Sequence, residues 1–203
     1  MKVINLYKEN AEVVTDVLYE AFYNYPVMRY VLGEKDDYDN RLRKLVGFFV
    51  ANRALRKEPM FGIYNSENRL VAAAIVTLPG DIPAPEELKR RREILWDEIG
   101  SDERMRYEAY GKAASGLLPK EPHHHLNMIG VRPAYKGQGL ARQLNTSVEE
   151  LVSSHPTSSG LSLNTEVESN VNFYLHLGYE IVGQKLFDNN FETWGFFKSK
   201  GKH

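Results

Sequence analysis

Apolar residues recur along the chain with two different periods, and segments of the two kinds are mixed in sequence. Apolar positions spaced three or four residues apart, typical of one face of a helix, occur at 11–22, 39–56, 85–99, 102–114, 140–152 and 170–177. Short runs with strand character occupy 2–6, 60–64, 70–78, 125–131, 161–164, 179–187 and 191–198. This order predicts an α+β fold with mixed connections between its strands.

Turn residues fix several boundaries. Asn65-Ser66-Glu67-Asn68 and Asp188-Asn189-Asn190 each separate two predicted strands, so we expect a hairpin at both places. Pro26 is expected to interrupt the first helix. The two charged helices at about 85–115 lie between predicted strands, and we interpret them as a helical insertion in a single domain that spans residues 1–203.

The strand at 125–131 ends beside the most informative stretch of the sequence. Because side chains alternate across a strand, we expect two face groups: Leu126 and Met128 on one side, and His125, Asn127, Ile129 and Val131 on the other.

Composition narrows the function classes. Of the 203 residues, 42% are hydrophobic and 26% charged, as in a soluble globular protein, and the formal net charge is -1. This balance gives no general attraction to nucleic acid or to an anionic membrane. Without cysteines, disulfides, thiolate metal sites and a cysteine nucleophile are excluded. No apolar run approaches the roughly 20 residues of a membrane helix, and the N-terminus turns polar too early for a signal peptide, so we expect a cytoplasmic protein.

A glycine turn between the 125–131 strand and the following helix has the chemistry of an anion site. It reads Val131-Arg132-Pro133-Ala134-Tyr135-Lys136-Gly137-Gln138-Gly139-Leu140-Ala141. The first backbone N–H groups of a helix are unpaired, and glycine lets a phosphate come close to them. The residues alone therefore predict a phosphate or pyrophosphate site, with a turn that serves only the fold as the alternative. Neither the Walker A pattern nor the three-glycine dinucleotide fingerprint is present, which argues against a nucleotide-binding module.

The glycine turn resembles the central motif of the GNAT acetyltransferases, Gln/Arg-x-x-Gly-x-Gly/Ala, with Lys136 at its first position. Val131-Arg132-Pro133 is similar to the family's exit from its fourth strand. A second match follows about 40 residues later, where Asn170-Val171-Asn172-Phe173-Tyr174 with Gly178 and Tyr179 is similar to Asn-x-x-x-Tyr-x-x-x-Gly-Phe. The two motifs together cover roughly residues 123–183.

The resemblance implies a GNAT-like fold and a set of site residues. The fold would be a mixed, mostly antiparallel sheet with splayed fourth and fifth strands and helices on both faces. The strand edge at Ile129 and Val131 would bind the pantetheine arm of acetyl-CoA, the acyl donor, with Asn170 near that arm. The residues implied to hold the pyrophosphate are Lys136, Gly137, Gln138, Gly139, Leu140 and Ala141.

The implied reaction is direct attack of an amine on the thioester. Tyr174 would protonate the departing thiolate, and His125, with an ordinary pKa near 6.5, is our first candidate for the base. Asn127 could hold a water molecule, and Glu166 is a second candidate base. A metal site at His123-His124-His125 is disfavoured because consecutive strand side chains point to opposite faces.

The identity of the acyl acceptor is the least determined part of the implied reaction. Tyr23, Tyr25 and Tyr30 crowd the end of the first helix and predict an aromatic acceptor pocket, with Tyr107 and Tyr110 as candidates from the insertion. We expect a small-molecule primary amine. A protein N-terminal or lysine acetyltransferase and a non-catalytic acyl-CoA-binding regulatory module stay open, as does a homodimer.

Overall fold

The computed structural model describes residues 1–80, 83–187 and 190–201. Its helices are α1 (Ala11–Phe22), α2 (Pro26–Leu32), α3 (Tyr38–Leu55), α4 (Glu86–Ile99), α5 (Ser101–Ser115), α6 (Leu140–Ser154) and α7 (Glu168–His176), with 3₁₀ turns at Lys8–Asn10 and Pro133–Tyr135. Its strands are β1 (Val3–Leu6), β2 (Met60–Tyr64), β3 (Leu70–Thr77), β4 (His124–Val131), β5 (Gly160–Thr165), β6 (Glu180–Phe187) and β7 (Phe191–Ser199). Every predicted helix and strand is present, with ends within two residues of the prediction. The predicted turn at 188–190 lies partly outside the described residues.

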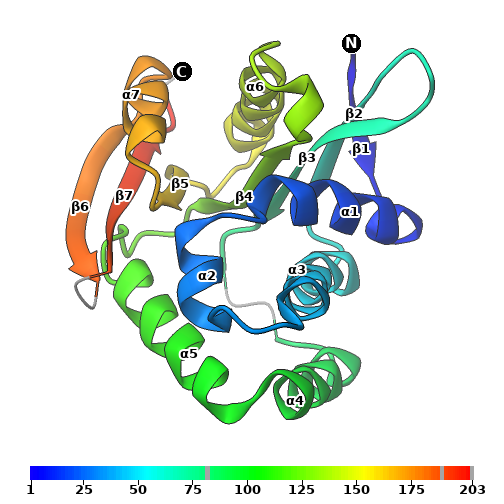
Figure 1. The fold of residues 1–203 in the computed structure, drawn as a ribbon. Helices are drawn as coiled ribbons and strands as arrows, with labels where there is room; N and C mark the ends of the chain where they lie inside the picture. The colour runs from blue at the N-terminus through cyan, green and yellow to red at the C-terminus, as the bar shows by residue number, and fades with distance from the viewer. Residues whose placement is uncertain (81–82, 188–189, 202–203) are drawn as a thin grey trace.

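The strands form one seven-stranded sheet in the order β1-β2-β3-β4-β5-β7-β6. All neighbours are antiparallel except β4 and β5, which are parallel and pair only at His124↔Leu161 and His125↔Ser162. Beyond these two pairs the strands diverge, and Figure 1 shows the gap between them. The predicted α+β fold, with its mostly antiparallel sheet and splayed fourth and fifth strands, is confirmed.

Helices cover both faces of the sheet (Figure 1). The first core cluster joins α1, α2 and α3 to one face, through residues such as Leu18, Leu42 and Ile75. The second cluster packs α6 and α7 on the other face, where Leu144 and Val148 of α6 are fully buried. Each such side chain contributes roughly 1.5–3 kcal/mol when it leaves water, so the amphipathic face of α6 fixes this helix, and the turn before it, on the sheet.

α2 was not predicted. Pro26 does interrupt α1, but it also occupies the first turn of a new helix whose N-cap is Tyr25, in extended conformation. Proline has no N–H to lose at that position and its φ already suits a helix, so a single residue ends one helix and begins the next. The short α2 turns Tyr25 and Met28 toward the centre of the molecule.

The face assignment within β4 was wrong. Register shifts between Ile75 and Val76, which pair with Met128 and Leu126, so Asn127 is the extra residue of a bulge. A bulge reverses the alternation of side chains. Met128 therefore packs in the cluster under α1 and α3, whereas Leu126 joins the opposite cluster together with Ile129 and Val131. His125 and Ile129 consequently do not share a face.

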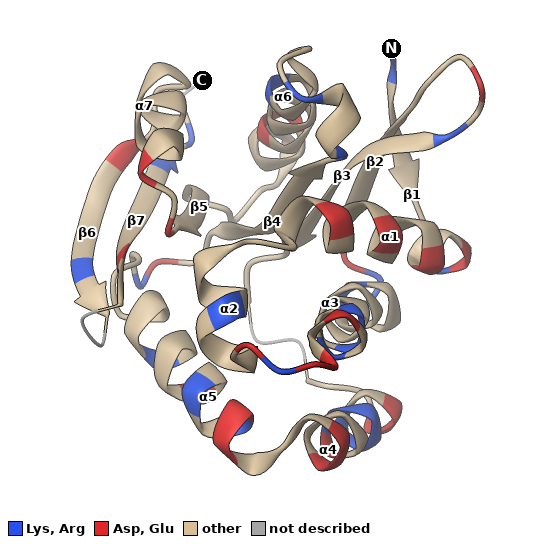
Figure 2. Ribbon diagram, viewed as in Figure 1, with Lys and Arg blue, Asp and Glu red and all other residues tan. Residues whose placement is uncertain are grey.

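α4 and α5 pack against the helical layer, because α4 contacts α3 and α5 contacts α2. Buried Glu103 of α5 forms ion pairs with Lys35 at 2.7 Å and with Arg41 at 3.1 Å, which attach this block to the rest of the helical layer. Glu98 of α4 forms a further ion pair with Lys44 of α3 at 3.1 Å. Figure 2 shows that α4 carries both acidic and basic residues. Across the described part of the chain, no helix has the combination of length and apolar character needed to cross a membrane.

Candidate active site

The glycine turn ends in a left-handed residue that begins α6. Gly137 has φ of 79° and Gly139, the N-cap, has φ of 74° and ψ of 10°. These values favour glycine, because other L-residues pay a steric cost there. A Cβ added at either position would meet no atom within 4 Å, so the surface above the turn is open. A bound group could approach the backbone closely at both places.

The backbone amides of this turn are available to an anion. The first bond of α6 runs from Gln143 N to Gly139 O, at 3.1 Å. The amides of 137–142 donate no hydrogen bond to another described residue. Lys136 and Arg142 are exposed beside them. Unpaired amides at a helix N-terminus with two cations nearby fit a pyrophosphate.

Arg132, in contrast, is a structural residue of the turn. Its side chain is buried, donates to Leu70 O at 2.8 Å and forms an ion pair with Glu20. Its backbone N–H donates to Val71 O at 2.9 Å. These contacts anchor the start of the turn to β3, a role that the motif alone did not reveal.

The gap between β4 and β5 leaves one edge of β4 without a strand partner. Ile129 and Val131 pair with Ala74 and Ala72 of β3 on their other side. An unpaired strand edge presents N–H and C=O groups to any extended partner. The two residues predicted to bind a pantetheine arm thus lie where such an arm could add to the sheet.

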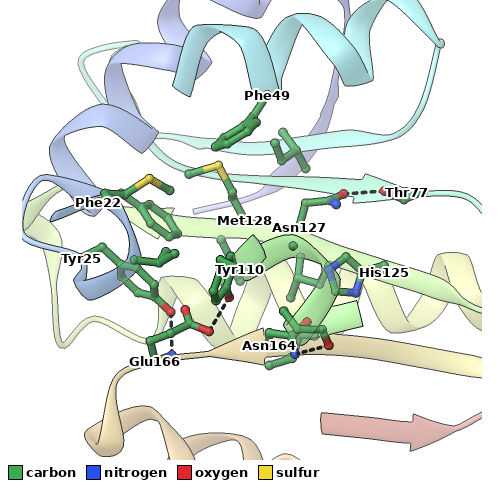
Figure 3. Close-up of a pocket in the computed structure, with 18 of the residues that line it drawn as sticks. Phe22, Tyr25, Phe49, Thr77, Tyr110, His125, Asn127, Met128, Asn164 and Glu166 are labelled. Atoms are coloured by element: carbon green, nitrogen blue, oxygen red, sulfur yellow. Dashed lines mark hydrogen bonds between the residues drawn. The ribbon is translucent and has the colours of Figure 1, made fainter. Parts of the chain in front are cut away.

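A cavity of about 440 Å³ lies next to β4 and β5, on the side covered by α1, α2, α3 and α5 (Figure 3). Its walls come from α1, α2, α3, α5, α7, β3, β4 and β5, and most of its lining is apolar or aromatic. The polar side chains that line it are Tyr25, Asn52, Arg53, Thr77, Tyr107, Tyr110, Ser115, His125, Asn127, Asn164, Glu166, Asn170 and Tyr174.

Tyr174 lines this cavity from α7. Its ring is 6% exposed and packs against Tyr179 and Phe196, with centroid distances of 5.6 Å to each. Burial, and secondarily the charge of Glu166, raise the pKa of Tyr174 well above its ordinary value. The hydroxyl therefore keeps its proton at neutral pH. A general acid must be protonated before it reacts, and Tyr174 meets this requirement.

His125 and Asn127 also line the cavity, but each already has a protein partner. His125 Nδ1 lies 2.8 Å from Ser162 Oγ, and Thr77 Oγ1 donates to Asn127 Oδ1 at 2.7 Å. Burial, with smaller contributions from the charges of His123 and Arg53, lowers the pKa of His125 to about 4. His125 is consequently neutral at pH 7 and a weak proton acceptor.

Glu166, just after β5, is the carboxylate of the cavity. Its side chain is 7% exposed, Tyr110 donates a hydrogen bond to its Oε1 at 2.6 Å, and its backbone N–H donates to Tyr25 Oη at 3.3 Å (Figure 3). Burial raises the pKa of Glu166 to about 7, although hydrogen bonding to Tyr110 and Tyr25 acts in the opposite direction. Glu166 is therefore poised to exchange a proton near neutral pH.

Of the other residues predicted for the site, only some line the cavity. Asn170 lines the cavity and donates to Thr165 Oγ1 at 3.1 Å; it does not cap α7, which begins at Glu168. Tyr25 lines the cavity, but Tyr23 and Tyr30 do not. Tyr23 donates to Asp39 at 2.5 Å, and Tyr30 packs on Phe187 and Phe191.

The three consecutive histidines do not converge. His124 is buried on the other side of the strand, with Nδ1 2.8 Å from Ser158 Oγ, whereas His125 faces the cavity. Within the described residues, no group of three or more His, Asp or Glu side chains could hold a metal ion.

Several residues of the cavity were missed in the sequence. Arg53, Thr77 and Asn164 come from α3, β3 and β5, and no motif marks them. The register of β3 against β4 places Thr77 beside His125, so a correct pairing of these strands would have indicated Thr77. Nothing local would have indicated Arg53.

Solved structures with this fold cover nearly the whole chain. A structure described as histone acetyltransferase HPA2 and related acetyltransferase from Corynebacterium glutamicum is 19% identical, with a TM-score of 0.75, and the match covers 100% of this chain and 97% of that one. Arylalkylamine N-acetyltransferase 2 from Aedes aegypti is 13% identical, with a TM-score of 0.66, covering 98% and 99%. Ribosomal-protein-S18-alanine N-acetyltransferase from Escherichia coli is 11% identical, with a TM-score of 0.58, covering 100% and 95%. At these identities the likeness concerns the fold alone.

The sequence itself gives the family. No curated protein sequence matches the chain. The family described as acetyltransferase (GNAT) domain matches residues 92–196, more than half of the chain, and this stretch contains both the glycine turn and the helix that carries Tyr174. The chain therefore belongs to the GNAT family of acetyltransferases.

Proposed function

We propose that the protein transfers an acetyl group from acetyl-CoA to the primary amine of a small molecule. The observation that carries this proposal is the arrangement at the divergence of β4 and β5. A helix N-terminus with unpaired amides opens beside a free strand edge, and the cavity at that edge contains both a protonated tyrosine and a buried carboxylate.

The residues present fit the acyl donor. The open surface over Gly137 and Gly139, the amides of 137–142 and the cations Lys136 and Arg142 suit its pyrophosphate. Ile129 and Val131 offer the strand edge for an extended amide-containing arm, and Asn170, like Ile129, lines the cavity. When bound, acetyl-CoA would supply the reactive thioester.

Within the cavity, Tyr174 is suited to protonate the departing thiolate. It retains its proton and lines the same cavity as the carboxylate. General acid catalysis of this kind contributes typically about 10²–10⁴-fold to a rate.

A small acceptor is favoured over a protein. The cavity of about 440 Å³ is near the lower end of the range for small-molecule sites, roughly 300–1,000 Å³. α5 supplies part of its wall through Tyr107, Tyr110 and Ala114, which restricts access for a folded polypeptide. Structural neighbours include both arylalkylamine and protein acetyltransferases, so the cavity is the better guide.

The first test is ligand binding followed by turnover. Acetyl-CoA and CoA should each raise the melting temperature by roughly 5–10 °C at about a hundredfold excess over Kd, because they bind only the folded state. ATP lacks the pantetheine arm and should raise it much less. Release of free CoA thiol in the presence of a panel of primary amines should then identify acceptors.

Two results would count against the proposal. Equal stabilisation by ATP and CoA would indicate a nucleotide site. Stabilisation by CoA without turnover of any amine in the panel would favour a non-catalytic acyl-CoA-binding module.

A further inference from the structure

Glu166 differs from the other buried carboxylates of the described chain in having no cation. Buried Glu58 forms an ion pair with Arg53 at 2.7 Å, and buried Glu103 forms ion pairs with Lys35, Arg41 and Arg106. No Lys, Arg or His in the described residues is within ion-pair distance of Glu166. A buried carboxylate without a countercharge is costly when it is ionised, and a cationic ligand in the cavity would offset that cost.

The groups that face Glu166 leave room for such a partner. Tyr110 of α5 donates to Oε1, and Tyr25, at the start of α2, contacts the backbone amide. Tyr174 of α7 is the third titratable neighbour, since the charge of Glu166 acts on it. All three are neutral hydroxyls at pH 7. The hydrogen bonds from Tyr110 and Tyr25 still leave acceptor capacity unused, because an ionised carboxylate offers about four lone-pair sites.

The rest of the lining is mostly apolar or aromatic, with neutral polar side chains such as Asn52, Thr77 and Asn164, and it carries no free positive charge. Phe22, Met28, Leu45, Phe49, Ile75 and Met128 are among its lining residues. Its only basic side chains among the described residues are Arg53 and His125. Arg53 is already paired with Glu58, and His125 is neutral. An acceptor that carried a carboxylate or phosphate would find no partner for it here.

Building on the proposed acetyl transfer, we propose that Glu166 binds the ammonium group of the acceptor and removes its proton, and that the acceptor is a compact apolar or aromatic primary amine without an acidic group. Glu166 supplies the one negative charge for the ammonium. The aromatic and aliphatic wall accepts the remainder of the molecule.

The proton and electron balance of the step is complete without another reactant. Glu166 takes one proton from the ammonium, which frees the lone pair of the nitrogen. The nitrogen forms a C–N bond with the thioester carbonyl carbon as the C–S bond breaks, and Tyr174 gives its proton to the departing sulfur. The second proton lost by the nitrogen goes to the tyrosinate and restores Tyr174, and Glu166 then releases its proton to solvent. The products are the amide, free CoA and one proton, with both side chains back in their starting forms.

Three amines test the proposal on the full-length protein with acetyl-CoA. Phenethylamine and phenylalanine differ only in the carboxylate, and spermidine is an amine with further positive charges and no aromatic ring. We expect kcat/KM for phenethylamine to exceed the values for the other two by about a hundredfold or more, because the cavity has no partner for a carboxylate or for a second ammonium group. Glu166→Gln should lower the value for phenethylamine about a hundredfold or more, while the Kd of CoA stays unchanged.

Glu168→Gln provides the matched control, because Glu168 is an exposed glutamate two residues away, and it should retain wild-type turnover. Preference for phenylalanine or spermidine over phenethylamine would overturn the substrate class but leave acetyl transfer intact. A Glu166→Gln variant within about threefold of wild type would remove Glu166 from the chemistry. Absence of CoA binding in the wild type would instead refute the proposed function, and this inference with it.

Discussion

Tyr110 Oη donates a hydrogen bond of 2.6 Å to Glu166 Oε1, and this contact joins two segments that are far apart in sequence. Tyr110 belongs to α5, within the block that we interpret as an insertion, whereas Glu166 follows β5. The block therefore reaches the cavity, where its Tyr110 lowers the pKa of the Glu166 carboxyl. Because the hydrogen bond stabilises the charged form, it holds the pKa of Glu166 below the value that burial alone would give.

Tyr110→Phe should consequently shift the pH dependence of turnover. Glu166 must be ionised to accept a proton, so kcat should rise with pH through about 7 in the wild type. Without the hydrogen bond the pKa of Glu166 is higher, and the rise should move to higher pH. We expect kcat to fall about tenfold at pH 7 and to recover largely at pH 9, because a hydrogen bond to a charged group contributes roughly 1.5–3 kcal/mol. Initial rates from pH 5.5 to 9.5 measure this.

The control for this variant is Tyr7→Phe, since Tyr7 is exposed and outside the cavity. Its pH profile should match the wild type. A Tyr110→Phe profile reduced equally at every pH would mean that Tyr110 only packs in the cavity wall.

Glu166 should also make the stability of the protein depend on pH. Its pKa is raised from 4.5 to about 7 on folding, so the folded state binds more protons than the unfolded state between these values. Stability therefore declines as pH rises from about 4.5 to 7, and above 7 the burial of the carboxylate costs on the order of 3 kcal/mol. Glu166→Gln should be more stable than wild type at pH 8, and the difference should shrink toward pH 4.5.

Urea denaturation at pH 5 and pH 8, without ligand, tests this prediction. Glu168→Gln should change stability by only a few tenths of a kcal/mol at either pH, because Glu168 is exposed. Equal stability of Glu166→Gln and wild type at pH 8 would show that the carboxylate is solvated or paired in solution.

The glycine turn and α6 could be predicted well because their cause is local. Left-handed Gly139 opens the helix, and the apolar spacing of Leu140, Leu144 and Val148 fixes the face that packs on the sheet. The second motif likewise gave the position of Tyr174. Each of these features depends on residues within one turn or one helix of each other.

The features that could not be predicted from the sequence depend on contacts between segments that are distant along the chain. The bulge at Asn127 arises from the pairing of β4 with β3, and a strict alternation within β4 could not include it. Glu166 was considered as a base, but its surroundings were not foreseeable, because Tyr25 and Tyr110 are 141 and 56 residues away. Tyr23 and Tyr30 shared the aromatic pattern of Tyr25, yet of these three tyrosines only Tyr25 lines the cavity.

Tyr174→Phe should separate catalysis from donor binding. The variant loses the proton that we assign to the departing thiolate and little of the ring packing on Tyr179 and Phe196. We expect kcat to decrease about 10- to 100-fold or more, while the Kd of CoA, measured by calorimetry, stays within about twofold. Tyr179→Phe is the comparison, because the Tyr179 hydroxyl donates to Asn145 at 2.8 Å and serves the fold. That variant should lose stability but keep its kcat, and an unchanged kcat in Tyr174→Phe would exclude Tyr174 as the acid.

Gly139→Ala should weaken donor binding beyond its effect on stability. Alanine in the left-handed conformation costs about 1–2 kcal/mol, and its Cβ would enter the open surface where we expect the pyrophosphate. The Kd of CoA should rise about tenfold or more. Gly33→Ala is the matched control: Gly33 also has positive φ, at 69°, with no atom within 4 Å of an added Cβ, but it lies at the end of α2. This variant should lose stability with the Kd of CoA unchanged, and equal Kd values for both variants would contradict the anion site.

Glu58→Gln should change which acceptors are used, because it leaves Arg53 as an unpaired cation in the cavity wall. Arg53 lines the cavity and Glu58 does not, and the two now neutralise each other at 2.7 Å. Breaking a buried pair costs about 3–5 kcal/mol, so the variant should be less stable, but a carboxylate on the acceptor could then serve as the missing partner. The ratio of kcat/KM for phenylalanine over phenethylamine should therefore increase about tenfold or more, measured at a temperature where the variant is folded. Adding Arg53→Met removes the cation and should return the ratio to the wild-type value, since the two changes act through one interaction. A ratio that is the same in Glu58→Gln and wild type would mean that Arg53 does not reach the acceptor.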